Sequence, residues 1–306
     1  MNNRKSMVAT LVAGLACAAA AAMAPEDASR AERFANPPAS ARILPIHHGR
    51  PDSPERIDAE LKSLADDGFG GMACNVKFSE SYLERAADWE MVRYTVRKAR
   101  AAGLALWLYD ECGYPSGTAR DKVLRGHPEW QARGVLIAVT NAAAGARVEL
   151  RLPPGIFRRA VACPLLPGGP DTDAAVVLDS CAIAGKVIWT APAGGQAGWR
   201  VYGITADLLY ESTHSALRLS FKNPYINLLM AEPTARFIEL THVRYAKELG
   251  DDLKAFTSTF TDEPSLMSCW MRPMPYYVLP WCPDLPADYR ARTGRDLLAD
   301  VPAILD

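Results

Sequence analysis

Two pairs of adjacent carboxylic acids each follow a short apolar run in this 306-residue sequence. Asp110-Glu111 comes after residues 104–109, and Asp262-Glu263 comes after residues 256–260. Two carboxyl groups that face one cleft can hydrolyse a glycosidic bond, because one protonates the leaving oxygen while the other acts as base or nucleophile. We therefore take Asp110, Glu111 and Glu263 as candidate catalytic residues. For Asp110-Glu111 the alternative is a capping or turn role.

Glu263 is the candidate general acid. It directly precedes Pro264, which fixes the local backbone and stiffens the loop that aims the carboxyl group. A general acid must be protonated near neutral pH, and burial or a neighbouring negative charge can achieve this. Asp262, Asp110 and Glu111 could supply that charge.

Other polar and aromatic side chains lie at the ends of the same apolar runs and could bind a sugar through hydroxyl groups and ring faces. The predicted substrate-binding residues are His47, His48, Asn75, Tyr109, Tyr114 and Asp262. Both histidines could instead be structural. A metal-dependent hydrolase that uses them is disfavoured, because adjacent histidines rarely bind one ion together. Trp107 lies inside its apolar run and is expected in the core.

The segments that must position these residues alternate between strand and helix. Short apolar runs at 43–46, 70–74 and 104–109 are separated by two helical patterns. Ser53-Pro54 predicts the start of the first helix, and Asp88 is expected to cap the second. This alternation predicts βαβ units and a parallel sheet, in which the carboxyl ends of the strands share one face. The acids are therefore expected to face one cleft.

The alternation stops at residues 135–222, where RVELRL, AAVVLD, KVIWT and GWRVYGI predict an inserted antiparallel β subdomain. A helix opened by Pro233 and a fourth strand at 256–260 follow. The expected fold class is α/β: a partial (β/α)8 TIM-type barrel of about four βα units. The barrel occupies residues 25–134 and 223–306, on either side of the insertion.

The composition narrows the function classes. With 49% hydrophobic and 23% charged residues, the chain has an ordinary globular composition. A net charge of −1 gives no basic footprint for nucleic acid or for an anionic membrane. The cysteines beyond Cys17 include no C-x-x-C pair, which argues against a zinc site, although one or two disulfides are permitted. No metal site is predicted from the residues.

Residues 1–24 predict a secretory signal peptide. Arg4 and Lys5 precede an alanine-rich apolar run, and A-x-A cleavage sites follow it. The mature chain then has no transmembrane segment and is expected in the periplasm or outside the cell. A lipid anchor at Cys17 is the alternative.

The stretch LWLYDECGYPSG, followed by INLLMAEPTARFIELTHVRYAKELGDD and FTDEPS, resembles glycoside hydrolase family 106. The resemblance runs from about residue 43 to the C-terminus. It implies a secreted α-L-rhamnosidase-like enzyme with a (β/α)8 barrel, two catalytic carboxylates, inversion of configuration and, in some members, calcium. It carries over Asp110, Glu111 and Glu263 as acids of the cleft.

A full (β/α)8 barrel takes about 250 residues, which is more than this chain offers outside its insertion. The competing hypothesis is therefore a truncated, non-catalytic carbohydrate-binding remnant. A partial barrel also exposes the edges of its first and fourth strands, and self-association would cover them.

Overall fold

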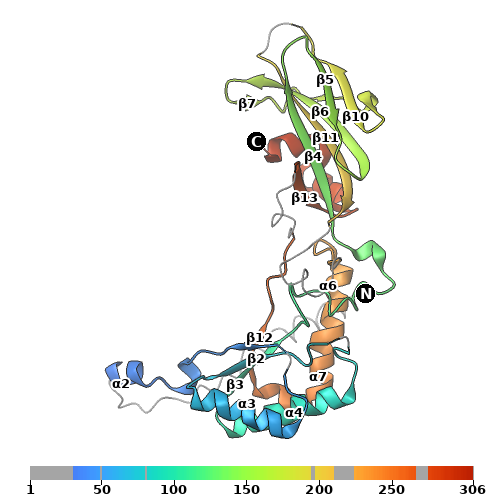
Figure 1. Ribbon diagram of the computed structural model, residues 1–306. Helices are drawn as coiled ribbons and strands as arrows, with labels where there is room; N and C mark the ends of the chain where they lie inside the picture. Colours follow the sequence, from blue (N-terminus) through green and yellow to red (C-terminus); the bar gives the residue numbers. More distant parts are fainter. Residues whose placement is uncertain are drawn as a thin grey trace. The chain divides into compact units, whose positions relative to one another are not determined.

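A computed structural model describes residues 30–48, 50–79, 81–193, 197–209, 224–266 and 275–305. The chain forms two compact units, each with its own sheets (Figure 1). The first unit consists of Met1–Val123 and Ala235–Pro264, and the second of Leu124–Thr234 and Ser265–Asp306. The signal peptide predicted at residues 1–24 lies outside the described residues.

The first unit is built on a four-stranded parallel sheet with the strand order β1-β2-β3-β12. Its strands are β1 (Ile46–His47), β2 (Gly71–Cys74), β3 (Ala105–Tyr109) and β12 (Phe256–Phe260). The helices in this part of the fold are α2 (Arg30–Ala35), α3 (Pro54–Asp66), α4 (Ala86–Ala101), α6 (Ala231–Ile238) and α7 (Arg244–Leu249). A π-helical turn, Glu239–Val243, joins α6 to α7, and short 3-10 helices occupy Ala39–Ala41 and Gly250–Ala255. The parallel pairing agrees with the alternation of strand and helix in the sequence.

Helices α3 and α4 pack against β2 and β3 and cover one face of this sheet (Figure 1). In α3, Ser53 occupies the N-cap position and its side chain accepts a hydrogen bond from the Arg56 backbone N–H, as predicted. The predicted cap of α4 is wrong: the helix begins at Ala86, and Asp88 lies buried in its first turn. The apolar residues of both helices recur at helical spacing and face the sheet.

The second unit contains a six-stranded and a three-stranded sheet, both antiparallel. The larger sheet has the order β13-β4-β11-β6-β7, and β8 pairs with β6. The smaller sheet has the order β5-β10-β9. Their strands are β4 (Arg133–Ala142), β5 (Arg147–Arg151), β6 (Ile156–Leu166), β7 (Gly169–Pro170), β8 (Val176–Val177), β9 (Ala182–Ile183), β10 (Lys186–Thr190), β11 (Trp199–Leu208) and β13 (Tyr277–Trp281). Two helices, α8 (Leu285–Thr293) and α9 (Leu297–Leu305), and 3-10 helices at Pro128–Trp130 and Asp179–Cys181 complete it.

The two faces of the larger sheet bury different cores, because successive residues of a strand point to opposite faces. Tyr202 of β11 belongs to the core that includes Val301 of α9. Its neighbour Val201 belongs to the core that includes Val148 of β5 and Val187 of β10. The sheet is therefore covered by helices on one face and by the smaller sheet on the other.

The chain divides differently from the expected assignment of residues 223–306 to the barrel. Ala235–Pro264 contributes to the first unit, but β13 pairs antiparallel with β4 of the second. The reason is that β13 satisfies the free edge of β4, while Leu297 and Val301 are buried in the core beneath that sheet. A helical pattern that follows a strand does not reveal which sheet the strand joins.

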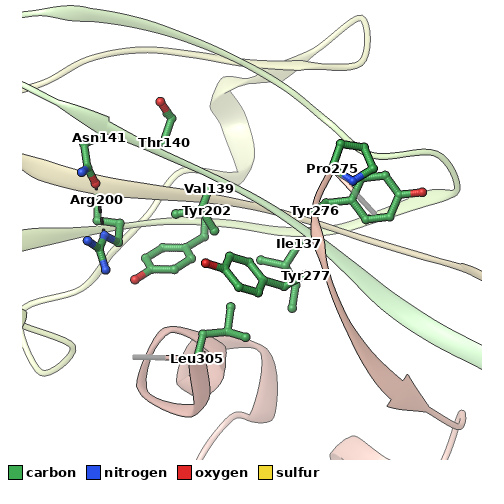
Figure 2. A pocket seen from close by; sticks show the side chains of 10 residues that line it. All are labelled: Ile137, Val139, Thr140, Asn141, Arg200, Tyr202, Pro275, Tyr276, Tyr277 and Leu305. Carbon is green, nitrogen blue, oxygen red and sulfur yellow. Dashed lines mark hydrogen bonds between the residues drawn. The ribbon is translucent and has the colours of Figure 1, made fainter. Parts of the chain in front are cut away.

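A pocket of about 270 Å³ lies on the larger sheet of the second unit, beside the last residue of α9 (Figure 2). Tyr202, Tyr277 and Leu305 are among its lining residues. Arg200 Nε donates to Asn141 Oδ1 at 3.1 Å on its rim. The pocket contains none of the side chains for which the sequence predicts chemistry.

The cysteines in the described part of the chain are free thiols: Cys74, Cys112, Cys163, Cys181 and Cys282. Within the described ranges, no helix combines the length and the apolar character needed to cross a membrane.

Candidate active site

The acids that follow β3 and β12 lie together in the first unit. These strands are parallel neighbours, and Tyr109 lies opposite Phe260 at their carboxyl ends. The Asp110 backbone N–H donates to the carbonyl oxygen of Phe260 at 3.1 Å, so the pairing continues one residue beyond β3. Asp110-Glu111 and Asp262-Glu263 therefore leave the sheet side by side, as the sequence predicts for strands that end on one face.

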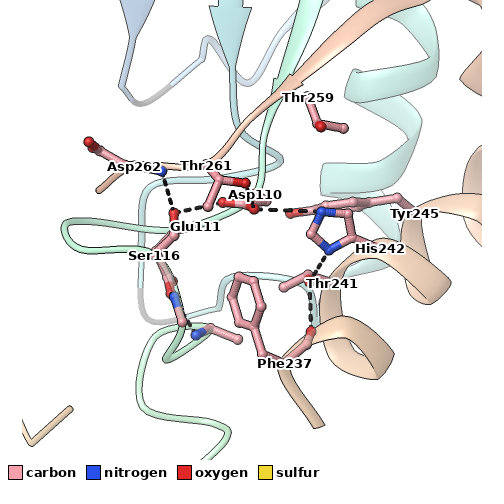
Figure 3. A network of polar contacts seen from close by, with 12 residues as sticks. Asp110, Glu111, Ser116, Phe237, Thr241, His242, Tyr245, Thr259, Thr261 and Asp262 are labelled. Carbon is pink, nitrogen blue, oxygen red and sulfur yellow. Dashed lines mark hydrogen bonds and ion pairs between the residues drawn. The ribbon is translucent and has the colours of Figure 1, made fainter. Parts of the chain in front are cut away.

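Asp110 is fully buried and ties the two strand ends together (Figure 3). Its Oδ1 accepts a hydrogen bond from Ser116 Oγ at 2.7 Å, and its Oδ2 accepts one from Thr261 Oγ1 at 2.7 Å. Ser116 also exchanges two bonds with Asp262: its Oγ accepts from the Asp262 N–H at 2.9 Å, and its own N–H donates to the Asp262 carbonyl oxygen at 2.8 Å. Asp110 and Ser116 thus form a small polar core under the strand ends.

His242 is a site residue that sequence reasoning missed. It lies in the π-helical turn, and its Nε2 is 3.6 Å from Asp110 Oδ2. Thr241 donates its hydroxyl proton to the Phe237 carbonyl oxygen at 2.6 Å, so its Oγ1 is the acceptor for His242 Nδ1–H at 2.9 Å. The other ring nitrogen, Nε2, then faces the Asp110 carboxylate. The contact between Nε2 and Oδ2 is favourable when one proton is shared between these two atoms.

The burial of this pair affects its two members in opposite directions. Burial raises the pKa of Asp110, while the bonds from Ser116 and Thr261 and the charge of His242 act against the rise. Burial lowers the pKa of His242, and the nearby Asp110 opposes the decrease. The sequence around His242 contains no motif that marks this residue as functional. Its π-helical turn is a feature that is frequent at functional sites, but only the structure reveals that turn.

Glu111 is 1% exposed, and backbone N–H groups occupy both of its carboxylate oxygens. Oε1 accepts from Cys112 at 2.8 Å and Arg120 at 2.8 Å; Oε2 accepts from Gly117 at 3.2 Å, Thr118 at 2.8 Å and Ala119 at 2.7 Å. Burial raises the pKa of this carboxyl group, and those backbone bonds oppose the rise. The geometry does not fit the predicted catalytic role of Glu111, because a base or nucleophile must reach the substrate.

Glu263 and Asp262 are each hydrogen-bonded to a tyrosine. Glu263 is exposed, and its Oε2 accepts from the Tyr114 hydroxyl at 2.7 Å. The Tyr109 hydroxyl is shared between the Gly113 carbonyl oxygen and Asp262 Oδ2, which lies at 2.7 Å. The bond to Glu263 is the main reason why the pKa of Tyr114 rises to about 12. Glu263 also has a φ of +38°, a left-handed conformation that a residue other than glycine adopts only under constraint.

The two predicted histidines point to opposite faces of the sheet, because successive residues of a strand alternate between its faces. His47 turns toward α3, where its Nδ1 lies 2.6 Å from Glu60 Oε1. The next residue, His48, lies beside Tyr109, with the ring centroids 5.5 Å apart. Asn75 is buried, and its Nδ2 donates to the Glu111 carbonyl oxygen at 3.1 Å. It therefore holds the backbone of the acids and is not exposed to a substrate.

Trp107 does not lie in the core as expected. It is 38% exposed, because it points to the sheet face opposite α3 and α4.

The described residues do not fit the calcium that the family resemblance implies. No group of three or more histidine, cysteine, aspartate or glutamate side chains within them is arranged to hold a metal ion. The carboxylate oxygens of Asp110 and Glu111 are already hydrogen-bond acceptors. We therefore assign no step to a metal.

No protein-family model matches the chain. No curated protein matches it either. Among solved structures, it is distantly similar in fold to the rhamnosidase from Novosphingobium sp. PP1Y, with 13% sequence identity and a TM-score of 0.48. The match covers 91% of this chain and 43% of that one, so the chain spans less than half the length of that structure. Membership of glycoside hydrolase family 106 stays a prediction.

Proposed function

We propose that this chain is a glycoside hydrolase-like protein that cleaves O-glycosidic bonds with the two carboxylates that follow β12, Asp262 and Glu263. One observation carries the proposal. The parallel pairing of β3 with β12 brings Asp262 and Glu263 beside Tyr109 and Tyr114, and each tyrosine hydroxyl donates to one of the two acids. Two carboxyl groups with different surroundings suit a reaction that needs one proton donor and one base or nucleophile.

Glu263 is the residue that we assign to proton transfer. It is exposed where a substrate could reach it, and the constrained backbone at +38° is typical of residues held for function. The Tyr114 hydroxyl donates to Glu263 Oε2 and so fixes the orientation of this carboxyl group. A bound sugar would remove water from the carboxyl group and so favour the protonated form that a general acid needs.

Asp262 is the second carboxylate of the proposed site. Tyr109 holds its Oδ2, and Ser116 holds its backbone on both sides. Asp110 supports Asp262 indirectly, because it accepts hydrogen bonds from Ser116 and Thr261. His242 lies beside Asp110 on the side of the π-helical turn. The ring of Tyr114 is partly exposed next to Glu263 and suits the C–H face of a sugar ring. Tyr109 is fully buried, so its predicted contact with a sugar is wrong and it acts here by holding Asp262.

The finer parts of the proposal rest on the sequence motifs. The four-stranded parallel sheet is part of a (β/α)8 barrel, α-L-rhamnosides are the first substrates to test, and the protein is exported to the periplasm or beyond. The strand order and the helices on one face of the sheet support the barrel. The N-terminal charge and alanine-rich run support export, with a lipid anchor at Cys17 as the alternative.

A second candidate function is carbohydrate binding without hydrolysis. It is favoured by the state of Asp110 and Glu111, since internal hydrogen bonds occupy two of the three acids that the sequence predicts to be catalytic. In this alternative, Asp262 and Glu263 would accept hydrogen bonds from sugar hydroxyls.

The two candidates are separated by measuring hydrolysis and binding on the same protein. We expect the purified chain to release phenol from an aryl α-L-rhamnoside or another member of a panel of aryl glycosides. Glu263→Gln should reduce this release, whereas Glu55→Gln, which changes an exposed glutamate in the first turn of α3, should not. Calorimetric binding of the free sugars without release of phenol would favour the second candidate. Neither hydrolysis nor binding across the panel would contradict both.

A further inference from the structure

Residues 112–120, called here the Glu111 loop, carry the side chains that contact the proposed acids. The loop consists of turns and bends, so helix or strand pairing does not satisfy its backbone N–H groups. Buried N–H groups without partners are costly. The conformation of this loop therefore needs another acceptor, and the loop folds around one.

That acceptor is the Glu111 carboxylate. Five backbone N–H groups converge on it at distances between 2.7 and 3.2 Å, and the Thr118 hydroxyl adds a sixth bond at 3.2 Å. Successive N–H groups that converge in this way form a concave anion site.

The backbone at the end of the loop is strained, and the Glu111 carboxylate is bonded to that strained turn. Three consecutive residues other than glycine, Ala119, Arg120 and Asp121, have φ angles of +47°, +55° and +61°. Each such residue costs about 1–3 kcal/mol, so this turn persists only where other interactions offset the strain. The turn brings the Ala119 and Arg120 N–H groups onto Glu111, and these two bonds contribute to offsetting the strain.

The same loop reaches both proposed acids. Tyr114 donates to Glu263, while Ser116 bonds Asp110 through its side chain and Asp262 through its backbone. We infer that Glu111 is a positioning residue: its carboxylate is the internal anion around which the loop folds, and the loop then sets the orientation of Glu263 and Asp262. The anion part of this inference stands on the loop alone, while the effect on turnover rests on the proposed function.

A charge requirement distinguishes this role from simple packing. Glutamine has nearly the shape of glutamate, but its amide NH2 would face backbone N–H groups that need an acceptor. Alanine removes the anion and leaves space in which formate could supply a carboxylate. Aspartate keeps the charge and moves it by one methylene group.

The primary measurement does not depend on activity. With 3-fluorotyrosine incorporated, the ¹⁹F signal of Tyr114, assigned with Tyr114→Phe, reports the bond to Glu263 through its pH titration. In the wild type we expect Tyr114 to titrate at higher pH than the ordinary value of a tyrosine, because of that bond. Glu111→Gln and Glu111→Ala should lower the titration midpoint of Tyr114, and formate should restore it in Glu111→Ala but not in Glu111→Gln.

Turnover is the second measurement. A displaced acid should reduce kcat/KM on the order of 10²-fold, mostly through kcat, with partial recovery in formate for Glu111→Ala alone. Glu60→Gln, a partly buried glutamate that contacts His47, is the control and should leave the Tyr114 signal unchanged. If Glu111→Ala fails to fold by circular dichroism, Glu111→Asp takes its place and should keep most of the Tyr114 shift.

Two results would overturn the inference. One is an unchanged Tyr114 titration in folded Glu111→Gln. The other is lost turnover with an unchanged Tyr114 signal, which would make Glu111 a direct participant in catalysis. A shifted Tyr114 signal in a chain that hydrolyses nothing even as wild type would support the positioning role and count against the proposed function instead.

Discussion

Glu263 is the exposed member of the three acids for which the sequence predicts catalysis. Two local features of the sequence predicted this residue: it follows an apolar strand, and a proline comes directly after it. Sequence patterns could not show that Glu111 lies outside the group of residues that reach the substrate. Its role depends on where the backbone N–H groups of residues 117–120 point, and sequence patterns carry no information about that.

Glu263→Gln tests proton donation directly. If Glu263 protonates the leaving group, the substitution should reduce turnover of natural glycosides by a factor on the order of 10²–10⁴. The loss should be smaller on glycosides of activated phenols, because such a leaving group departs without a proton. The comparison of kcat/KM on both substrate types is the measurement. Equal losses would make Glu263 a base, a nucleophile or a binding residue.

His242→Ala should raise the pKa of Asp110, because the charge of His242 is one of the causes that hold it down. Asp110 has a raised pKa in the folded state, so its contribution to stability is fully present below the unfolded pKa of about 3.9 and is lost as pH rises through the folded value. Removing His242 enlarges that loss. The variant should therefore be destabilised more at neutral pH than in acid, where Asp110 is protonated.

Carboxyl-carbon NMR titration and urea unfolding at two pH values measure both effects. Phe237→Leu is the control, because it changes the packing against the His242 ring without changing a charge. An unfolding free energy reduced equally at both pH values would show that His242 acts through packing alone.

At the scale of elements, local periodicity predicted most of the first unit. The helical spacing of Ile57, Leu61 and Leu64 is sufficient to define the buried face of α3, and β12 has the predicted bounds. The first strand was placed too early, at 43–46, whereas β1 is Ile46–His47. A strand of this length takes its limits from the pairing with β2, which is a tertiary contact.

Gly71 allows β2 to approach β3 closely. Its φ is +151°, and a Cβ atom there would lie 1.8 Å from the Ala105 carbonyl oxygen. Gly71→Ala should reduce the free energy of unfolding by about 3 kcal/mol or more, since backbone atoms must move. Gly68→Ala is a matched control: its φ is +81° with no atom within 4 Å of the added Cβ, and it should cost only about 1 kcal/mol. Urea unfolding compares the two, and equal costs would contradict a steric requirement at Gly71.

At the scale of the whole molecule, the sequence predicted an antiparallel insertion but not the final division of the chain. The segment that contains β13 has a strand pattern compatible with either sheet type. β13 joins the antiparallel sheet because β4 has a free edge there. The sequence does not show this edge, since it exists only once the insertion has folded.

The four-stranded sheet ends in β1 on one side and β12 on the other. Ser258 and Thr259 of β12 are exposed, as is Trp107 on the neighbouring strand. Exposed strand edges pair readily with other chains, so we predict that the purified protein self-associates as its concentration rises. Thr259→Lys should shift the equilibrium toward monomer, whereas a lysine at the exposed Thr190 of β10 should not. Light scattering over a concentration series is the measurement, and a wild type that stays monomeric throughout would contradict the prediction.

The two adjacent acids after β3 differ in when their partners become available during synthesis. The Glu111 carboxylate bonds to residues one to nine positions away, so its loop can close as soon as that stretch has been made. Asp110 waits for Thr261, which follows 151 residues later, after most of the second unit. Contacts between such distant residues form slowly, because a long loop must close first. A nascent chain would therefore hold a finished Glu111 loop next to an Asp110 that still faces water, and the proposed active site would be among the last parts of the protein to mature.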